Sequence, residues 1–516
     1  MIKNIDEKYV EFLRDETRMI GIASHISFPI NREETAVLVE HLSQNEIPFT
    51  VQGSRTGIAG AAVPMGGHIL NLCAMNRIIG IKTSNKGEFL LKVQPGVLLC
   101  DFNAGLKKTS FDVTDWEESS KETLTKLIKA EPQFFPPDPT ENSATIGGMF
   151  SCNARGINGY LYGSTAEYVE EITVNLTSGE IWNLSRGQFL FDKTGCPLPN
   201  GKRLTVEYLG NDFPVCKNLI AYQGMDLIDL FAGSEGMLGV VSELTIRLCK
   251  KPAEKWGVVF FFSSPTGAVD FTQALWQRER SFDVVKVAAI EYFDKNSLDM
   301  VGWLKTRVTK LKEIPEPPKG MKEAVYVELT SDESDSIKAI LVEVLELFVE
   351  CGGDEDATWA ASDASEIERF RLLRHSVPES VNTRIDIIRQ NDSRITKLGA
   401  DLSAPRKYLA QNLDMYRDSM TKAGIYGIIF GHIGNNHFHV NLIPEDYSQY
   451  QRGQVLIAAW AKEIAGQGGT IATENGVGKV KKQLYLDNVS SRQLRMARAF
   501  KDFLDPKGLL NPGNML

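Results

Sequence analysis

Cysteine, histidine and long apolar runs are all scarce in this chain. Among its 516 residues are only seven cysteines and seven histidines. The cysteines are scattered, odd in number and without a Cys-x-x-Cys pair, so nothing supports a disulfide framework, a zinc ribbon or an iron–sulfur cluster. No apolar run reaches the roughly 18 residues of a membrane helix, and the first residues lack the pattern of a signal peptide. We therefore expect a cytoplasmic protein without a transmembrane segment.

Clusters of basic residues are missing as well. Lysine and arginine number 57 against 66 acidic residues, which gives a formal net charge of −9, and no dense Lys/Arg block is present. This balance argues against nucleic acid as a partner. Hydrophobic residues at 43% and charged residues at 24% are ordinary for a globular protein. The length exceeds that of a usual single domain, so we expect two or three domains.

Small residues, in contrast, concentrate in two stretches. Residues 51–64 read Val-Gln-Gly-Ser-Arg-Thr-Gly-Ile-Ala-Gly-Ala-Ala-Val-Pro, and residues 231–241 read Phe-Ala-Gly-Ser-Glu-Gly-Met-Leu-Gly-Val-Val. A long anionic cofactor needs backbone N–H groups at close range, which Gly, Ala and Ser permit. The first stretch is not the Gly-x-Gly-x-x-Gly of a Rossmann fold, and no acidic residue follows about 20 positions later to hold a ribose. NAD is therefore the poorer candidate.

Hydrophobic periodicity predicts a mixture of helices and strands. The segment Lys-Lys-Pro-Ala at 250–253 favours a domain boundary, and residues 101–130 are charged and helical in character, as in an insertion. The expected strands are 47–51, 68–72, 89–93, 171–176, 240–247, 257–262 and 324–329. The expected helices are 33–46, 266–279, 335–350 and 491–504.

Three of the histidines lie within the short segment 432–439, His-Ile-Gly-Asn-Asn-His-Phe-His. If 437–441 is a strand, His437, His439 and Asn441 point to one face. The turn formed by Gly-Asn-Asn then folds His432 back beside them, and Glu474, in a Gly-bounded loop, would add a carboxylate. Imidazoles and a carboxylate are ligands for a divalent metal. A polar hairpin with satisfied imidazoles is the alternative.

Six short motifs follow one another along the chain. Their order identifies a family more specifically than any single motif does. They are 51–64, 135–148, 159–163, 231–241, 431–441 and 470–478, and the tail 505–513 closes the series. In these motifs the chain resembles the FAD-linked oxidoreductases of the vanillyl-alcohol-oxidase/p-cresol-methylhydroxylase (PCMH) superfamily. It looks like the branch that holds D-lactate dehydrogenase, the glycolate oxidase flavin subunit and D-2-hydroxyglutarate dehydrogenase. The resemblance covers roughly residues 25–516.

The resemblance implies an α+β flavoprotein of two domains. A PCMH-type FAD-binding domain would take residues 1–252 and regain the chain at 477–516, and an α/β cap domain for the substrate would take 253–476. Residues 53–60 would wrap the FAD pyrophosphate with backbone donors, beside the positive charge of Arg55, and FAD would be held without a covalent bond. The residues implied to contact FAD are Gly53, Ser54, Arg55, Thr56, Gly57, Ile58, Gly60, Ala61, Pro137, Thr145, Ile146, Gly147, Gly148, Asn153, Gly163, Gly233, Glu235, Gly236, Gly239, Val240 and Val241.

The resemblance also implies a metal and a substrate site. In the resembled enzymes the positions that match His432, His439 and Glu474 bind Zn²⁺ or Mn²⁺, which coordinates a 2-hydroxy acid and lowers the pKa of its hydroxyl. Arg374 and Lys397 stand where the family places cations, and Asn441, on the strand face of His437 and His439, is the remaining catalytic candidate. Arg374 would fork onto a carboxylate. A solvated helix charge is the alternative for Arg374.

The chain departs from its relatives at two positions of this site. The family commonly reads Glu-His-Gly where this chain has Asn475 between Glu and Gly, and that histidine is the usual general base. An Asn cannot accept a proton at neutral pH. Conversely, His437 stands where the family has Asn. Either the base has moved to His437, or His437 is an extra ligand. The exchange is also compatible with a base elsewhere in the chain and with loss of this activity.

The expected reaction is oxidation of a D-2-hydroxy acid, such as D-lactate or glycolate, to the 2-oxo acid by hydride transfer to flavin N5. Electrons would then pass to a partner protein, an electron-transfer flavoprotein or a quinone. One alternative is a flavoenzyme of the same fold without net oxidation, similar to alkyl-glycerone-phosphate synthase. Another is a flavin-carrying subunit of a larger electron-transfer complex. The sequence is compatible with a homodimer and does not name the acid.

Overall fold

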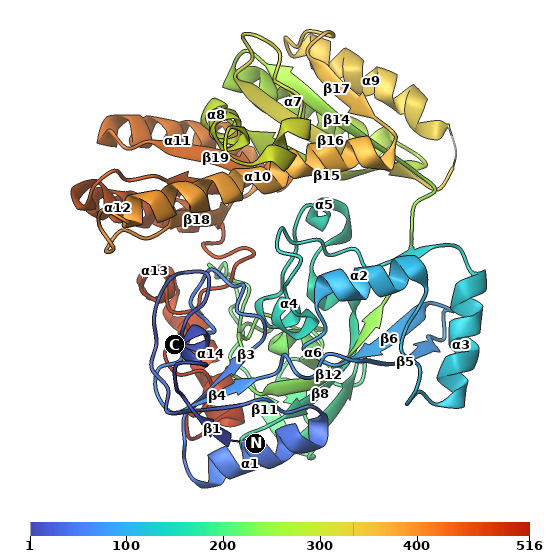
Figure 1. The fold of residues 1–516 in the computed structure, drawn as a ribbon, viewed down its shortest axis with the longest axis vertical. Coiled ribbons are helices and arrows are strands. Elements are labelled where there is room, and N and C mark those ends of the chain that lie inside the picture. The colour runs from blue at the N-terminus through green and yellow to red at the C-terminus, as the bar shows by residue number, and fades with distance from the viewer. Residues whose placement is uncertain (1, 334) are drawn as a thin grey trace. The chain divides into compact units, whose positions relative to one another are not determined.

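The structure is a computed structural model that describes residues 2–333 and 335–516. The chain divides into two compact units (Figure 1). Unit 1 comprises Met1–Gly156, Ser164–Lys251 and Glu474–Leu516, and unit 2 comprises Ile157–Gly163 and Pro252–Thr473. This division differs from the expected boundaries in three respects, of which the smallest is that Pro252 groups with unit 2. The short segment 157–163 groups with unit 2, and the return to unit 1 falls at Glu474.

Unit 1 contains two main sheets. The smaller sheet has the order β1-β2-β4-β3, in which β2, β4 and β3 run parallel and β1 is antiparallel. The larger sheet has the order β5-β6-β12-β8-β9 and is antiparallel. The strands are β1 (Ile2–Asn4), β2 (His25–Ser27), β3 (Phe49–Gln52), β4 (His68–Asn71), β5 (Ile78–Thr83), β6 (Phe89–Val93), β8 (Val169–Asn175), β9 (Ile181–Ser185) and β12 (Val240–Arg247).

The helices of unit 1 pack beside these sheets. In α1 (Arg32–Gln44), Asn31 caps the first turn by accepting the N–H of Glu34, and Leu38 and Leu42 are buried against Phe49. The other helices are α2 (Leu99–Lys108), α3 (Glu118–Lys129), α4 (Ile146–Cys152), α6 (Leu227–Phe231), α13 (Lys482–Asn488) and α14 (Ser491–Leu504).

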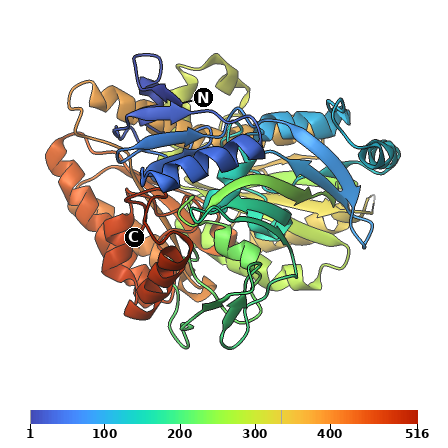
Figure 2. The same ribbon diagram turned by 90° about the horizontal axis from the view of Figure 1, so that it is seen from below.

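The tail that follows α14 returns to the first sheet. Phe49 donates its N–H to the carbonyl of Leu509 at 2.8 Å, and Asn511 donates to the carbonyl of Phe49 at 2.9 Å. The last residues of the chain therefore extend the sheet beyond β3, so that early and late segments lie side by side (Figure 2).

Unit 2 is built on one antiparallel sheet with the order β17-β14-β16-β15-β19-β20-β18. The strands are β14 (Glu254–Phe262), β15 (Val285–Phe293), β16 (Glu323–Ser331), β17 (Thr358–Ala361), β18 (Leu398–Ser403), β19 (Gly427–Gly431) and β20 (His437–Leu442). The helices are α5 (Gly159–Tyr162), α7 (Pro265–Arg278), α8 (Lys295–Lys305), α9 (Ser336–Glu350), α10 (Ala364–Arg389), α11 (Leu409–Ala423) and α12 (Tyr447–Gly466).

Different helices cover the two faces of this sheet. On one, which we call the α10 face, Phe261, Tyr326 and Phe430 share a core with residues of α8 and α10. On the other, the α11 face, the ring of Phe438 contacts Tyr292 of β15 and Tyr416 of α11. Because side chains alternate along a strand, neighbouring residues of β15 and β20 serve opposite faces.

Several predicted elements are confirmed. The strands expected at 89–93 and 240–247 and the helix expected at 491–504 coincide with β6, β12 and α14. The charged insertion contains α2 and α3. The pattern did not predict α10, which continues through Pro378. Among the described residues, no helix has both the length and the apolar character needed to cross a membrane.

Candidate functional site

The first glycine-rich loop joins the parallel strands β3 and β4, and the protein ties down its carbonyl groups. Gln52, a buried residue at the end of β3, donates to the carbonyl of Ala62 at 2.7 Å. The carbonyl of Ala59 accepts the N–H groups of Lys479 at 2.9 Å and of Val480 at 3.0 Å. Burial lowers the pKa of the Lys479 amine to about 8. The carbonyl groups of the loop are thus held by residues of unit 1.

The C-terminal tail joins the two glycine-rich loops. Asn511 accepts the N–H of Val51 at 2.7 Å and donates to the carbonyl of Glu235 at 2.5 Å. Asn514 donates to the carbonyl of Ala61 at 3.2 Å and to that of Glu235 at 3.3 Å. Two asparagine side chains therefore set the distance between loops that are far apart in the sequence.

The N–H groups of the first loop are arranged differently from its carbonyls. Within residues 2–333 and 335–516, no acceptor takes the backbone N–H groups of residues 54–58. A Cβ added at Gly57 would meet nothing within 4 Å. A run of backbone donors that no described residue accepts fits an anionic group such as the pyrophosphate of FAD.

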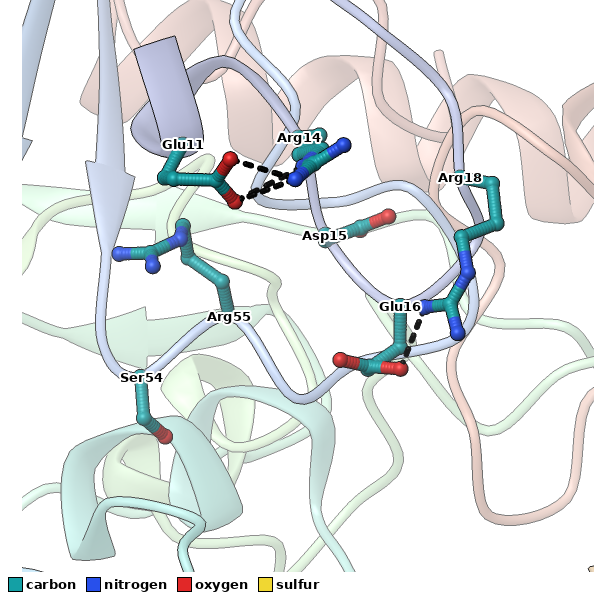
Figure 3. A pocket seen from close by; sticks show the side chains of 7 residues that line it. All are labelled: Glu11, Arg14, Asp15, Glu16, Arg18, Ser54 and Arg55. Atoms are coloured by element: carbon teal, nitrogen blue, oxygen red, sulfur yellow. Dashed lines mark hydrogen bonds and ion pairs between the residues drawn. The ribbon is translucent and has the colours of Figure 1, made fainter. Parts of the chain in front are cut away.

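A pocket of about 340 Å³ lies beside this loop (Figure 3). Its lining residues are Glu11, Arg14, Asp15, Glu16, Arg18, Ser54 and Arg55. Arg14 pairs with Glu11 and Arg18 pairs with Glu16. The guanidinium of Arg55 lies 4.2 Å from the centre of the Phe12 ring, so its position is set by a cation–π contact.

Five of the glycines predicted to contact FAD are required by packing within the protein. A Cβ at any of them would come within 2.3–2.8 Å of another side chain. These side chains are Thr145 at Gly53, Pro95 at Gly147, Asn218 at Gly233, Asn511 at Gly236 and Val174 at Gly239. Glycine at these positions brings chain segments together and so shapes the cradle around the loops.

The other predicted FAD contacts lie in unit 1, with one exception. The buried carboxylate of Glu235 accepts the N–H groups of Val477 at 2.6 Å and Gly478 at 2.8 Å. Asn153 is the C-cap of α4, and its side-chain oxygen accepts the N–H of Ala166 at 3.0 Å. Gly163 belongs to unit 2. The remaining ones are Thr56, Ile58, Gly60 and Ala61 in the first loop, Pro137, Thr145, Ile146 and Gly148 before and in α4, and Val240 and Val241 in β12.

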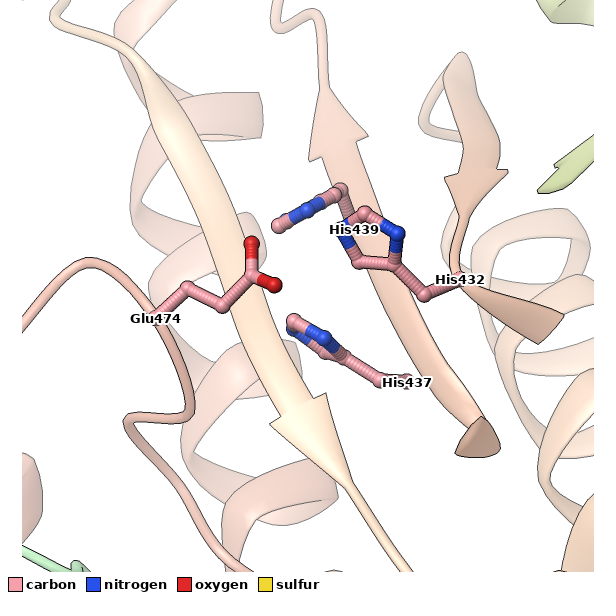
Figure 4. A group of neighbouring side chains, drawn as sticks. All are labelled: His432, His437, His439 and Glu474. Atoms are coloured by element: carbon pink, nitrogen blue, oxygen red, sulfur yellow. The ribbon is translucent and has the colours of Figure 1, made fainter. Parts of the chain in front are cut away.

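The three histidines gather as the sequence predicts. His437 and His439 lie on β20, and the turn at 433–436, with Asn436 at φ +46°, returns His432 to them. The ring centroids are 4.8 Å apart for His437 and His439, and 5.2 Å apart for His432 and His437. Glu474 directly follows the last residue of unit 2, and one ligand atom from each of the four residues lies within 4.8 Å of the others (Figure 4).

A carboxylate and an arginine orient His432 on the α10 face. Nδ1 of His432 is 2.5 Å from one oxygen of Glu291, and Nε of Arg374 donates to the other at 2.6 Å. Burial alone would raise the pKa of Glu291, but the charges of His432 and Arg374 hold it below its usual value. Arg374, 5% exposed, makes no other hydrogen bond among the described residues. Its Nη groups are the part of the guanidinium that a ligand could use.

A second carboxylate orients His437. Nε2 of His437 is 2.7 Å from Oδ1 of Asp401, a residue of β18, and both side chains are buried. Oδ2 of Asp401 accepts the N–H of Thr473 at 3.2 Å. Thr470, in the same segment, exchanges backbone hydrogen bonds with Ser403 at the end of β18. The chain is thus pinned to the sheet immediately before Glu474.

The other predicted substrate contacts lie at different places. Oδ1 of Asn441, two residues beyond His439 on β20, is buried and has no hydrogen-bond partner in the part of the chain that the structure describes. Lys397, just before β18, donates to Asn382 of α10 at 3.0 Å. Asn475 follows Glu474 and is half-buried.

Sequence reasoning missed Glu291 and Asp401. Their histidine partners are 141 and 36 residues away, so no local pattern links them. The available signal was a single acidic residue within an apolar strand, Ala-Ala-Ile-Glu-Tyr-Phe and Leu-Gly-Ala-Asp-Leu. A carboxylate inside such a run must find a charged or donor partner in the core.

Comparison with known proteins identifies the family. The family described as "FAD linked oxidases, C-terminal domain" matches residues 251–515, and "FAD binding domain" matches residues 23–118. The chain therefore belongs to the FAD-linked oxidases, which are flavin-dependent oxidoreductases, and it has both the FAD-binding domain and the C-terminal domain. This confirms the predicted superfamily.

Relatives and solved structures agree with this assignment. A D-lactate dehydrogenase of Anaerostipes hadrus is 25% identical over 99% of this chain and 93% of its own length, and glycolate oxidase subunit GlcD of Bacillus subtilis is 24% identical over 94% and 87%. The rat mitochondrial D-2-hydroxyglutarate dehydrogenase is 25% identical over 95% and 78%. The structure of a 4-ethylphenol oxidase from Gulosibacter chungangensis, 16% identical, covers 100% of this chain and 94% of its own with a TM-score of 0.68. The predicted α+β fold of PCMH type is confirmed.

Proposed function

We propose that this chain oxidises a 2-hydroxy acid of the D series, such as D-lactate or glycolate, to the 2-oxo acid with FAD and a divalent metal. The observation that carries the proposal is the cluster of buried His432 with the half-buried His439 and Glu474, in a chain whose relatives are named as dehydrogenases and oxidases of hydroxy acids. Free cysteines throughout the described residues fit a reducing compartment such as the cytoplasm.

FAD would be held by backbone groups of unit 1. The N–H groups of residues 54–58 would cradle the pyrophosphate, with the second loop and α4 lining the rest. When bound, FAD supplies the acceptor for a hydride leaving C2 of the substrate. No side chain predicted to contact FAD is a histidine or a cysteine, which supports non-covalent binding.

Residues of unit 2, together with Glu474 and Asn475, would supply the groups that orient and polarise the substrate. A divalent ion held by His432, His439 and Glu474 would lower the pKa of the hydroxyl that must be deprotonated. The two Nη groups of Arg374 would bind the carboxylate of the substrate, with Lys397 as a second cation. The amide of Asn441 would bind a substrate oxygen. Asn475 can hold a hydrogen bond but cannot take the proton.

Electrons would leave reduced FAD for a partner protein, an electron-transfer flavoprotein or a quinone. A second candidate is chemistry without net oxidation, and the Asn475 exchange favours it, because the family's usual base is missing. Alkyldihydroxyacetonephosphate synthase shares the fold, with a TM-score of 0.63 over 99% of this chain and 82% of its own at 14% identity.

The visible spectrum of purified protein tests the proposal. FAD should be present at about one per chain and should move to the supernatant on acid precipitation; flavin in the pellet would contradict non-covalent binding. Anaerobic addition of D-lactate, glycolate or D-2-hydroxyglutarate should bleach the flavin, with L-lactate as the matched control. Yellow protein that no 2-hydroxy acid bleaches would favour the second candidate, and protein that stays colourless with added FAD would contradict the proposal as a whole.

A further inference from the structure

His437 stands at the centre of the histidine group and has a partner of its own. Its ring lies 4.8 Å from that of His439 and 5.2 Å from that of His432, centroid to centroid. A buried carboxylate, Asp401, holds its Nε2 at 2.7 Å. Metal-binding histidines usually give their second ring nitrogen to a carboxylate or carbonyl, which fixes the ring. His437 carries this signature just as His432 does through Glu291.

The distances among the four side chains place His437 too close to the other three to stand apart from an ion that they hold. Four atoms that all lie within 4.8 Å of one another fit inside a sphere whose centre is at most about 3 Å from each, and a metal–ligand bond measures roughly 2.0–2.2 Å. An ion held by His432, His439 and Glu474 would therefore meet the ring of His437 as well. Since Nε2 faces Asp401, the atom that His437 offers is Nδ1.

We propose that His437 is a fourth protein ligand of the metal and not the proton acceptor. Asp401 is its positioning residue. The inference rests on the proposed function for the metal itself. Asp401 also accepts the N–H of Thr473 at 3.2 Å, so one carboxylate sets both the ring of His437 and the chain that leads into Glu474.

The ligand set indicates the class of metal. Three imidazoles and a carboxylate would fill a four-coordinate Zn²⁺ and leave no position for a substrate. An ion that accepts more than four ligands, such as Mn²⁺, keeps open positions for the hydroxyl and carboxylate oxygens of a 2-hydroxy acid. With His437 as a fourth protein ligand, the site therefore suits a metal ion that accepts more than four ligands.

X-ray absorption at the metal edge of the FAD-loaded protein, reconstituted with Mn²⁺, tests this. The unsubstituted protein should show three imidazoles and a total coordination number above four, and His437→Asn should show two. The dissociation constant for Mn²⁺ should rise at least tenfold in His437→Asn and about 10- to 100-fold in Asp401→Asn. The matched control is His41→Asn, an exposed histidine of α1 that should change neither value.

Two further results keep the test decisive. If His437→Asn is poorly folded because Asp401 stays buried without its imidazole, the double variant with Asp401→Asn removes that charge and should again show two imidazoles. Two imidazoles in the unsubstituted protein, with an unchanged dissociation constant in His437→Asn, would overturn the fourth ligand. Flavin bleaching by hydroxy acids in that same unsubstituted protein would show that the proposed function still stands.

Discussion

Glu291 and Tyr292 are neighbours in β15 and point to opposite faces of the unit 2 sheet. On the α10 face, Glu291 lies between His432 and Arg374, and these two charges hold its pKa below the usual value against the effect of burial. On the α11 face, Tyr292 and Arg417 both contact Glu323, yet burial raises the pKa of Glu323 to about 7.

The difference lies in the number of positive partners. Glu291 has two, whereas Glu323 has one arginine and also faces Asp294, whose own pKa is raised to about 6 by burial. Two buried carboxylates on one sheet are therefore held in different states. The carboxylate of Glu291 on the α10 face stays charged beside His432, and the carboxylate of Glu323 on the α11 face holds a proton that can be lost near neutral pH.

The largest expected effect is on the α10 face. His439→Ala removes an imidazole from the proposed metal group, so metal content should fall from about one per chain to background while FAD remains bound. Losing a residue that only hydrogen-bonds to a metal ligand typically costs roughly 10- to 100-fold, and the loss of His439 itself should slow flavin reduction by more than that. Elemental analysis and anaerobic stopped-flow measure the two quantities. Equal metal content in variant and parent would show that the group is not a metal site.

Glu291→Gln should have the next largest effect. It leaves Arg374 buried without its ion-pair partner, which typically costs about 3–5 kcal/mol of unfolding free energy. It also removes the acceptor that orients His432, so metal affinity should fall about 10- to 100-fold. Denaturant unfolding and metal titration measure both. Unchanged metal affinity would mean that Glu291 serves stability alone.

Glu323→Gln should change the pH dependence of stability rather than the site. Because the pKa of Glu323 is raised in the folded protein, its contribution is present below about pH 4.5 and is lost as pH rises through about 7. The variant should lack this loss, which amounts to at most about 3 kcal/mol between pH 5 and pH 8. Thermal melts of both proteins across that range measure it. If the melting temperatures of the parent and of Glu323→Gln fall in parallel as pH rises, groups other than Glu323 cause the pH dependence.

Tyr292→Phe should have the smallest effect and is the matched control for Glu291→Gln. It removes a hydroxyl that donates to Glu323, worth about 1 kcal/mol of unfolding free energy. Metal affinity and flavin reduction should be unchanged, since the hydroxyl lies on the α11 face. Weaker metal binding in this variant would contradict the separation of the two faces.

The local parts of this arrangement are predictable from the sequence, and the long-range parts are not. The strand at 437–441 and its turn follow from alternation and from Gly-Asn-Asn, and they bring the histidines together as expected. Glu291 and Asp401 come from distant strands whose pairing depends on the order of the whole sheet. Likewise, composition does not distinguish a glycine whose Cβ would strike a ligand from one, such as Gly53 or Gly147, whose Cβ would strike Thr145 or Pro95.

The tail that ties the two glycine-rich loops has a consequence for biosynthesis. Val51 and Asn511 are 460 residues apart, and the whole of 252–473 is synthesised between them. On the ribosome, the sheet of unit 2 can therefore form while the loops of unit 1 still lack the asparagines that set their spacing. Capture of the flavin should be among the last events in maturation, after the histidine group has taken shape.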